Sequence, residues 1–204
     1  MLYWCAWGLL RALLFLRARL IITGLETLPK KGSLILVSNH ISGFDPVLIG
    51  LAISKRRIRF MAKSELFRFI PFGWILWNLG AYPVNRMEIT KSFLKQTLSI
   101  LRSNQALLIF GEGTRNRTSA PMLPLKIGFA FLSEMAPAPV IPVFITGSKS
   151  MASAQFRPTI KVCFGNLIPS GSKQTILEQS MNAFSQFISA EEGTKKNNSG
   201  ILFH

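Results

Sequence analysis

The sequence predicts an α/β fold with a mostly parallel central sheet flanked by helices, and two observations support this prediction. From residue 33 onward, short apolar runs typical of buried strands alternate with longer runs that have helical periodicity. Strands that alternate with helices indicate crossover units, in which helices join parallel strands. The chain has 204 residues, of which 49% are apolar, so a single domain with a substantial core is expected.

The expected elements follow one another at short intervals. Strands are predicted at residues 34–37, 58–62, 106–110, 140–145 and 159–164. Helices are predicted at residues 46–54, 90–103, 126–135 and 174–189. The polar end of the chain has neither pattern. The predicted division is therefore an N-terminal helix at 1–23, a main domain at 24–190 and a flexible tail at 191–204.

Residues 1–22 form the most hydrophobic stretch of the chain, interrupted by Arg11, Arg17 and Arg19. Leucines recur on one helical stripe, at positions 2, 9, 13, 16 and 20. Its apolar residues favour membrane insertion by roughly 3–6 kcal/mol, whereas a single mid-bilayer arginine costs about 2.5–3.5 kcal/mol. We therefore expect an N-terminal membrane-associated helix that lies in the interface. A helix packed on the core and a helix that spans the bilayer are the alternatives.

The charge balance is strongly basic, with 24 Lys and Arg against 9 Asp and Glu and a formal net charge of +15. Such a charge attracts nucleic acids, anionic membranes and phosphorylated metabolites. Phe outnumbers Tyr 16 to 2, and Trp4 and Trp7 lie near the N-terminus, which favours lipid over single-stranded nucleic acid. The basic run at 55–59 is either a solvated face or a docking surface for anionic ligands. The predicted partner is an anionic membrane surface, not a nucleic acid.

A histidine and an aspartate follow the first predicted strand, as His40 and Asp45. Asp45 before Pro46 is a strong helix start, with Asp as N-cap and Pro at the first helical position. In that interpretation His40 is an ordinary polar group at a strand end. Alternatively, the loop folds the Asp45 carboxylate onto the imidazole and leaves the other ring nitrogen free to accept a proton. The only other histidine is His204, so an imidazole base would be His40.

Three further segments contain glycine or proline within or next to an apolar run, and two of them also contain an arginine. Phe-Gly-Glu-Gly-Thr-Arg at 110–115 follows a predicted strand, where open α/β sheets place ligands. Its glycines permit close backbone approach, Thr114 offers a hydroxyl and Arg115 can bind a phosphate bidentately. An ordinary turn with a solvated arginine is the alternative. Gly-Ala-Tyr-Pro-Val-Asn-Arg at 80–86 and Val-Ile-Pro-Val at 140–143 are equally consistent with a plain strand and turn.

In this order and spacing, the segments resemble the glycerolipid acyltransferase family, in particular the bacterial 1-acylglycerol-3-phosphate acyltransferases. The matching positions are Asn39, His40 and Asp45, then 62–66, 80–86, 112–115, Lys126 with Gly128, and 140–143. The resemblance extends over about residues 24–165 of the chain. Gly111 departs from it, because the family usually has proline before the Glu-Gly-Thr-Arg sequence.

The resemblance implies an O-acyltransferase in which His40 is the general base and Asp45 orients it. A fatty acyl group would pass from acyl-CoA or acyl carrier protein to lysophosphatidate, giving phosphatidate, with no metal and no other cofactor. The implied substrate-binding residues are Lys63, Arg86, Glu112, Gly113, Thr114 and Arg115.

We expect such an enzyme at the cytoplasmic face of a membrane, the bacterial inner membrane, as a peripheral or monotopic protein. Two alternatives stay open at this point. The acceptor could instead be glycerol-3-phosphate, a lysophospholipid or an acylated amino-acid lipid. The same histidine and aspartate could also activate water, which would make the protein a thioester or lysolipid hydrolase.

Overall fold

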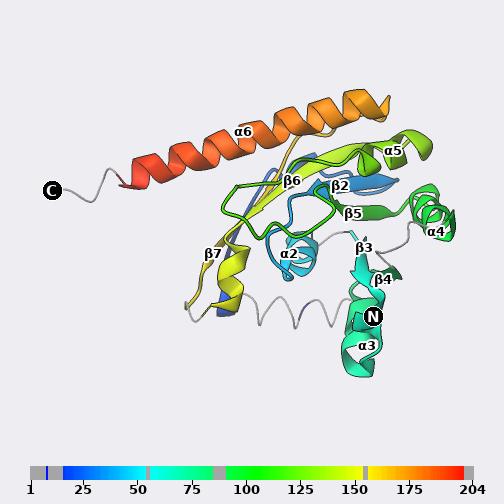
Figure 1. Cartoon of the computed structure of the whole chain (residues 1–204), viewed down its shortest axis with the longest axis horizontal. Helices are drawn as coiled ribbons and strands as arrows, with labels where there is room; N and C mark the ends of the chain where they lie inside the picture. The colour runs from blue at the N-terminus through cyan, green and yellow to red at the C-terminus, as the bar shows by residue number, and fades with distance from the viewer. Residues whose placement is uncertain (1–7, 9–15, 54–55, 85–90, 154–155, 200–204) are drawn as a thin grey trace.

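A seven-stranded sheet forms the centre of the protein, in a computed structural model that describes residues 8, 16–53, 56–84, 91–153 and 156–199 (Figure 1). Its strand order is β1-β7-β6-β2-β5-β3-β4. The strands are β1 (Arg19–Thr23), β2 (Leu34–Ser38), β3 (Ile58–Lys63), β4 (Ala81–Val84), β5 (Ala106–Phe110), β6 (Val140–Thr146) and β7 (Thr159–Phe164). Every neighbouring pair is parallel except β6 and β7, so the predicted mostly parallel sheet is confirmed.

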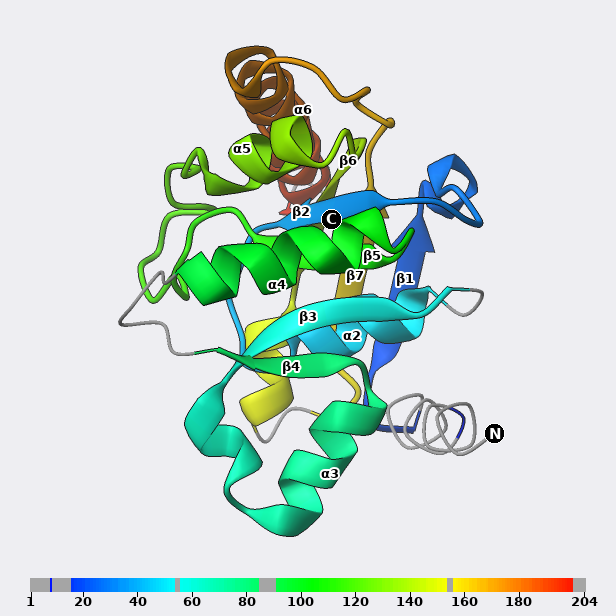
Figure 2. The same ribbon diagram turned by 90° about the vertical axis from the view of Figure 1, so that its right-hand side faces the viewer.

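Helices cover both faces of this sheet (Figure 2). The helices α2 (Asp45–Ala52) and α3 (Ile70–Asn78) pack on one face. The helices α4 (Lys91–Arg102), α5 (Gly128–Met135) and α6 (Lys173–Ser199) pack on the other. Three short 3-10 segments are η1 (Leu25–Thr27), η2 (Ser64–Phe67) and η3 (Ser148–Ala152).

The central strand β2 shows why the sheet is buried on both sides. Leu34 and Leu36 point into the apolar cluster under α2, while Ile35 and Val37 point into the cluster under α4, α5 and α6. All four side chains are inaccessible to solvent. Such a continuous apolar run is typical of parallel strands with helices on both faces.

The N-terminal prediction is wrong in part, because residues 19–23 are strand and not helix. They form β1, which pairs in parallel with β7 from Arg19 opposite Thr159 to Thr23 opposite Cys163. Two isoleucines and a threonine favour an extended chain here, and β7 offers an open edge. Residues 8, 16 and 17 are helical as predicted, and residues 1–7 and 9–15 of the predicted helix lie outside the described residues. Within the described part of the chain, no helix is long and apolar enough to cross a bilayer.

The C-terminal prediction is also wrong in part. Helix α6 continues through Ser199, so residues 191–199 are helical where a flexible tail was expected. An ion pair joins the first residue of this extension to the sheet, because Lys161 Nζ of β7 lies 2.9 Å from Glu191 Oε2.

The basic run at 55–59 divides between two environments. Arg56 is buried and donates hydrogen bonds to the carbonyl oxygens of Pro29 and Gly32. It therefore stabilises the fold and is not available for docking. Arg57, the next residue, is exposed.

Gly80 connects α3 to β4 in a conformation that side chains disfavour. Its φ is 93°, and a Cβ there would lie 2.3 Å from the carbonyl oxygen of Ile58 in β3. Gly32 has nearly the same φ, 92°, but a Cβ there would meet no atom within 4 Å. A side chain at Gly32 would therefore meet backbone strain alone, whereas a side chain at Gly80 would meet both backbone strain and steric overlap.

We predict that Gly80→Ala lowers the free energy of unfolding by about 3–5 kcal/mol, because strain and overlap add. Gly32→Ala is the matched control and should cost only the strain, about 1–2 kcal/mol. Equilibrium denaturation of both variants measures the difference. Equal losses would mean that β3 moves away at little cost and that the close approach at Gly80 is unimportant.

Candidate active site

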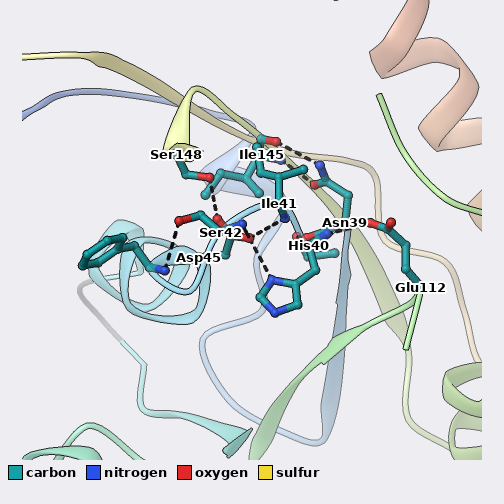
Figure 3. Close-up of polar contacts among 10 residues, drawn as sticks. Asn39, His40, Ile41, Ser42, Asp45, Glu112, Ile145 and Ser148 are labelled. Carbon is teal, nitrogen blue, oxygen red and sulfur yellow. Dashed lines mark hydrogen bonds and ion pairs between the residues drawn. The ribbon is translucent and has the colours of Figure 1, made fainter. Parts of the chain in front are cut away.

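His40 lies at the carboxyl edge of the sheet, two residues beyond the end of β2. The preceding residue fixes this position, because the Asn39 side chain bonds to the backbone of β6 twice. Its Nδ2 donates to the Ile145 carbonyl oxygen at 2.9 Å, and the Ile145 N–H donates to its Oδ1 at 2.8 Å (Figure 3). Both Asn39 and His40 are buried. The carboxyl edge is where open α/β sheets bind ligands.

The Asp45 carboxylate folds back onto the His40 loop, so the second of the two interpretations is confirmed. Its Oδ2 lies 2.9 Å from His40 Nδ1 and accepts hydrogen bonds from the N–H groups of Ile41 and Ser42, each at 2.7 Å. The interpretation as a helix cap is wrong. Phe44 occupies the N-cap position of α2, and no side chain caps that helix. The carboxylate is thus committed to the loop and not to the helix.

Ser148 completes the environment of Asp45 and was not identified from the sequence. Its Oγ donates to Asp45 Oδ1 at 2.5 Å, and the residue is fully buried at the start of η3. Gly147, with a φ of 78°, turns the chain between β6 and η3. The only sequence signal was its position directly after the Val-Ile-Pro-Val strand and a glycine, a pattern common to many turns.

Two contacts fix the orientation of the His40 ring. Its Nδ1 faces Asp45, and its face stacks on Phe110 with centroids 3.8 Å apart and planes 16° from parallel. The carboxylate favours a proton on Nδ1. Nε2 is therefore the ring nitrogen that can accept a proton from a bound molecule, which is the arrangement required of a general base.

Glu112 supports the His40 loop from behind. Its Oε1 accepts from the His40 N–H at 2.7 Å, and its Oε2 accepts from the Leu123 N–H at 2.9 Å. Burial raises the pKa of this carboxyl above its ordinary value, although the two backbone donors act in the opposite direction. With 1% of its surface exposed, Glu112 holds the site together, whereas the sequence predicted a residue that touches the substrate.

The other predicted binding residues of this loop, Gly113, Thr114 and Arg115, are exposed. The Arg115 guanidinium lies against Gly43, since a Cβ built there would be 3.4 Å from its Nη2. The backbone also joins the two loops, because the Asn116 N–H donates to the His40 carbonyl oxygen at 2.7 Å. An exposed guanidinium next to a buried histidine can bind an anionic group of a substrate.

Two further predicted residues complete the set. Lys63 ends β3 at the same edge of the sheet, where its Nζ lies 3.0 Å from Glu65 Oε1 and the side chain is 58% exposed. Arg86 lies outside the described residues. The structure thus brings His40, Asp45 and Arg115 together and places Lys63 two strands away, beyond β5.

An apolar cavity of about 570 Å³ adjoins the Glu112 loop on the side of α4 and α5. Phe110, Gly111 and Gly113 form its wall toward the site, and Lys126 and Lys173 also line it. Gly111 fits closely here, because a Cβ would lie 2.4 Å from Leu125 Cδ2 and 2.9 Å from Val37 Cγ2, and those side chains would have to shift. The departure from the usual proline at this position therefore makes room for Leu125.

A family model described as Acyltransferase matches residues 19–146, from the start of β1 to the end of β6. The match spans more than half of the chain and contains His40, Asp45 and the 110–115 loop. The chain therefore belongs to the Acyltransferase family, as the resemblance of its motifs predicted.

Individual relatives narrow the comparison. The 1-acyl-sn-glycerol-3-phosphate acyltransferase of Streptococcus pneumoniae is 33% identical over 135 residues, which are 66% of this chain and 49% of the relative. A Bacillus subtilis protein of the same name is 30% identical over 141 residues, 69% of each chain. The chain thus spans about half the length of the first relative and about two thirds of the second. The crystal structure of the 1-acyl-sn-glycerophosphate (LPA) acyltransferase of Thermotoga maritima shares the fold, with a TM-score of 0.75 at 20% identity over 93% of this chain and 78% of that one.

We predict that Ser148→Ala lowers turnover roughly 10- to 100-fold while the Michaelis constant of the acceptor stays within about threefold, because a misplaced base affects the chemical step. Ser148→Thr, which keeps the hydroxyl, should restore much of the loss. The matched control is Ser180→Ala, a buried serine of α6 whose hydroxyl finds no partner within the described part of the chain. Steady-state kinetics of the folded variants test this, and wild-type turnover in Ser148→Ala would show that Asp45 needs no such support.

Proposed function

We propose that the protein transfers a fatty acyl group from acyl-CoA or acyl carrier protein to the free hydroxyl of lysophosphatidate, forming phosphatidate. The observation that carries this proposal is the His40 ring, held between Asp45 and Phe110 with an exposed arginine beside its loop. The printed names of the Streptococcus and Bacillus relatives support the same acceptor.

The mechanism follows from the orientation of the imidazole. His40 Nε2 takes the proton of the acceptor hydroxyl as the oxygen attacks the thioester carbonyl carbon, and the Asp45 carboxylate stabilises the imidazolium that forms. The carbon–sulfur bond then breaks, and the thiolate leaves with the proton returned by His40. The thioester is reactive enough for direct attack, so the protein needs no nucleophile of its own.

Cations at the sheet edge support the proposal of a phosphorylated acceptor. Arg115 lies against Gly43 of the His40 loop, and Lys63 ends a strand at the same edge. We assign the acceptor phosphate to these two residues, with Arg86 as a third contributor on sequence grounds. Holding the phosphate fixes the position of the neighbouring hydroxyl relative to Nε2. Glu112 contributes indirectly, through the His40 backbone.

The apolar cavity next to the Glu112 loop supports a substrate with a long hydrocarbon chain. Its volume of about 570 Å³ is within the range of ligand-binding cavities. We assign an acyl chain to it. Lipid substrates and a net charge of +15 further support a place at the cytoplasmic face of an anionic membrane, the bacterial inner membrane, as a peripheral or monotopic enzyme.

The proposed reaction is tested by a donor-by-acceptor matrix with purified protein in vesicles. Acyl-CoA and acyl carrier protein are each combined with lysophosphatidate, glycerol-3-phosphate, a lysophospholipid and an acylated amino-acid lipid. We expect phosphatidate as the main product, and His40→Ala should lower turnover roughly 10²- to 10⁴-fold. His204→Ala, at the only other histidine, is the control and should act like the wild type. Release of free fatty acid without an acceptor would identify a hydrolase and overturn the proposal.

We further predict that Arg115→Ala raises the apparent Michaelis constant of lysophosphatidate roughly 10- to 100-fold, the equivalent of a charge-assisted contact of about 1.5–3 kcal/mol. The apparent Michaelis constant of the acyl donor should change much less. Arg117→Ala is a matched control, since Arg117 is exposed on the same loop. If both variants bind the acceptor normally, the phosphate site lies elsewhere, and Arg86 and Lys126 become the next residues to test.

A further inference from the structure

The short helix α3 exposes large apolar side chains at the edge of the sheet. Figure 2 shows α3 beside β4, projecting beyond the body of the protein. Trp74 is 51% exposed, Trp77 48% and Ile75 42%, and Phe69 just before the helix is 69% exposed. Leu66 of η2 adds a further exposed side chain at 43%. We refer to residues 66–78 as the α3 lobe. Exposed apolar surface of this concentration indicates an interaction site.

The lobe is a packed structure. Leu76 and Leu79 anchor α3 in the core under β3 and β4. A Cβ at Gly73 would lie 2.6 Å from the Phe67 carbonyl oxygen, so α3 and η2 are in close backbone contact. The rings of Phe67 and Trp77 also meet edge to face, 5.4 Å apart. The exposed tryptophans are therefore presented on a rigid support.

The charges around the lobe indicate what covers it. From residue 66 to residue 84 the sequence contains one charged residue, the exposed Arg68 two residues before α3, and the exposed Glu65 just ahead of this stretch is paired with Lys63. At the other end, Gly80 packs on Ile58, whose neighbour Arg57 is exposed. An apolar surface with arginines at both ends suits a layer of hydrocarbon beneath anionic headgroups. A second copy of the chain is disfavoured, because each copy carries a net charge of +15.

We propose that the α3 lobe inserts into one leaflet of an anionic phospholipid bilayer. A helix of nine residues is about 14 Å long, far short of the roughly 30 Å of a bilayer core, so α3 lies in the interface with its tryptophans at headgroup level. The lobe follows β3, whose carboxyl end lies at the same sheet edge as His40. Insertion therefore brings the catalytic edge of the sheet to the lipid surface, whichever acceptor the enzyme uses.

The first test is sedimentation of the full-length protein with phosphatidylcholine–phosphatidylglycerol vesicles, without substrates. The double variant Trp74→Ser with Trp77→Ser should bind roughly 10- to 100-fold more weakly, because two large apolar groups no longer enter the lipid. The matched control is Leu167→Ser with Met181→Ser, two exposed apolar residues, the second on α6 at the opposite face. Circular dichroism and thermal unfolding confirm that both double variants are folded. Unchanged binding of the tryptophan variant would overturn the proposal.

A second measurement reports on the lobe itself. The chain has four tryptophans, so Trp4→Phe with Trp7→Phe leaves only Trp74 and Trp77 as emitters. With vesicles that contain brominated phospholipid, their fluorescence should be quenched and shifted to shorter wavelength. Vesicle-bound protein with unquenched tryptophans would overturn the proposal. So would a dimer in sedimentation velocity that the Trp74→Ser, Trp77→Ser variant abolishes without loss of vesicle binding, because a second copy would then cover the lobe. Neither measurement requires acyl transfer, so failure of the proposed reaction leaves it intact.

Discussion

The site depends on one buried charge, the carboxylate of Asp45. A carboxylate without solvent is strongly unfavourable unless donors surround it. Here the donors come from three places: the backbone of residues 41 and 42, the imidazole of His40 and the hydroxyl of Ser148. The first two belong to one loop, residues 40–42, whereas Ser148 follows β6, and all of them must reach the same two oxygens. The need to satisfy this group therefore fixes the loop after β2, the start of α2 and the turn after β6 relative to one another.

The strand order makes this convergence possible. Because β2 lies between β5 and β6, the loops that follow these three parallel strands meet at one edge. A hydrogen bond between a side chain and the backbone joins the loop after β2 to each neighbouring strand. The Asn39 side chain bonds to Ile145 of β6, and the Glu112 side chain, just after β5, bonds to the His40 backbone. These bonds join segments about 70 to 100 residues apart in sequence. The His40 loop is consequently held on both sides by hydrogen bonds between a side chain and the backbone, which makes it rigid.

The sequence was sufficient to predict those elements whose apolar pattern is contained within the element itself. The strands at 106–110 and 159–164 match the structure because apolar runs with clear ends need no partner to be recognised. The sequence was insufficient where a contact with a distant part of the chain decides the structure of a segment or the role of a residue. Strand β1 exists because β7 offers an edge some 140 residues away. Helix α3 was not predicted, since it contains proline and glycine, two poor helix formers, yet Pro71 falls in the first turn, where it is tolerated, and Gly73 permits contact with Phe67. The role of Ser148 as a donor to Asp45 could not be predicted, because the two residues meet only when β6 pairs with β2.

The single antiparallel pair, β6 with β7, has a consequence for how the chain enters the molecule. Since β1 is parallel to β7, it runs opposite to β2, β5 and β3, and its first residue lies at the edge where those strands end. Arg17, just before β1, confirms this placement by donating to the Ser153 carbonyl oxygen just beyond η3. Residues 16–18, just ahead of β1, therefore lie at the same edge of the sheet as His40. The direction of the β6–β7 ladder thus decides that the start of β1 and the His40 loop share one side of the molecule.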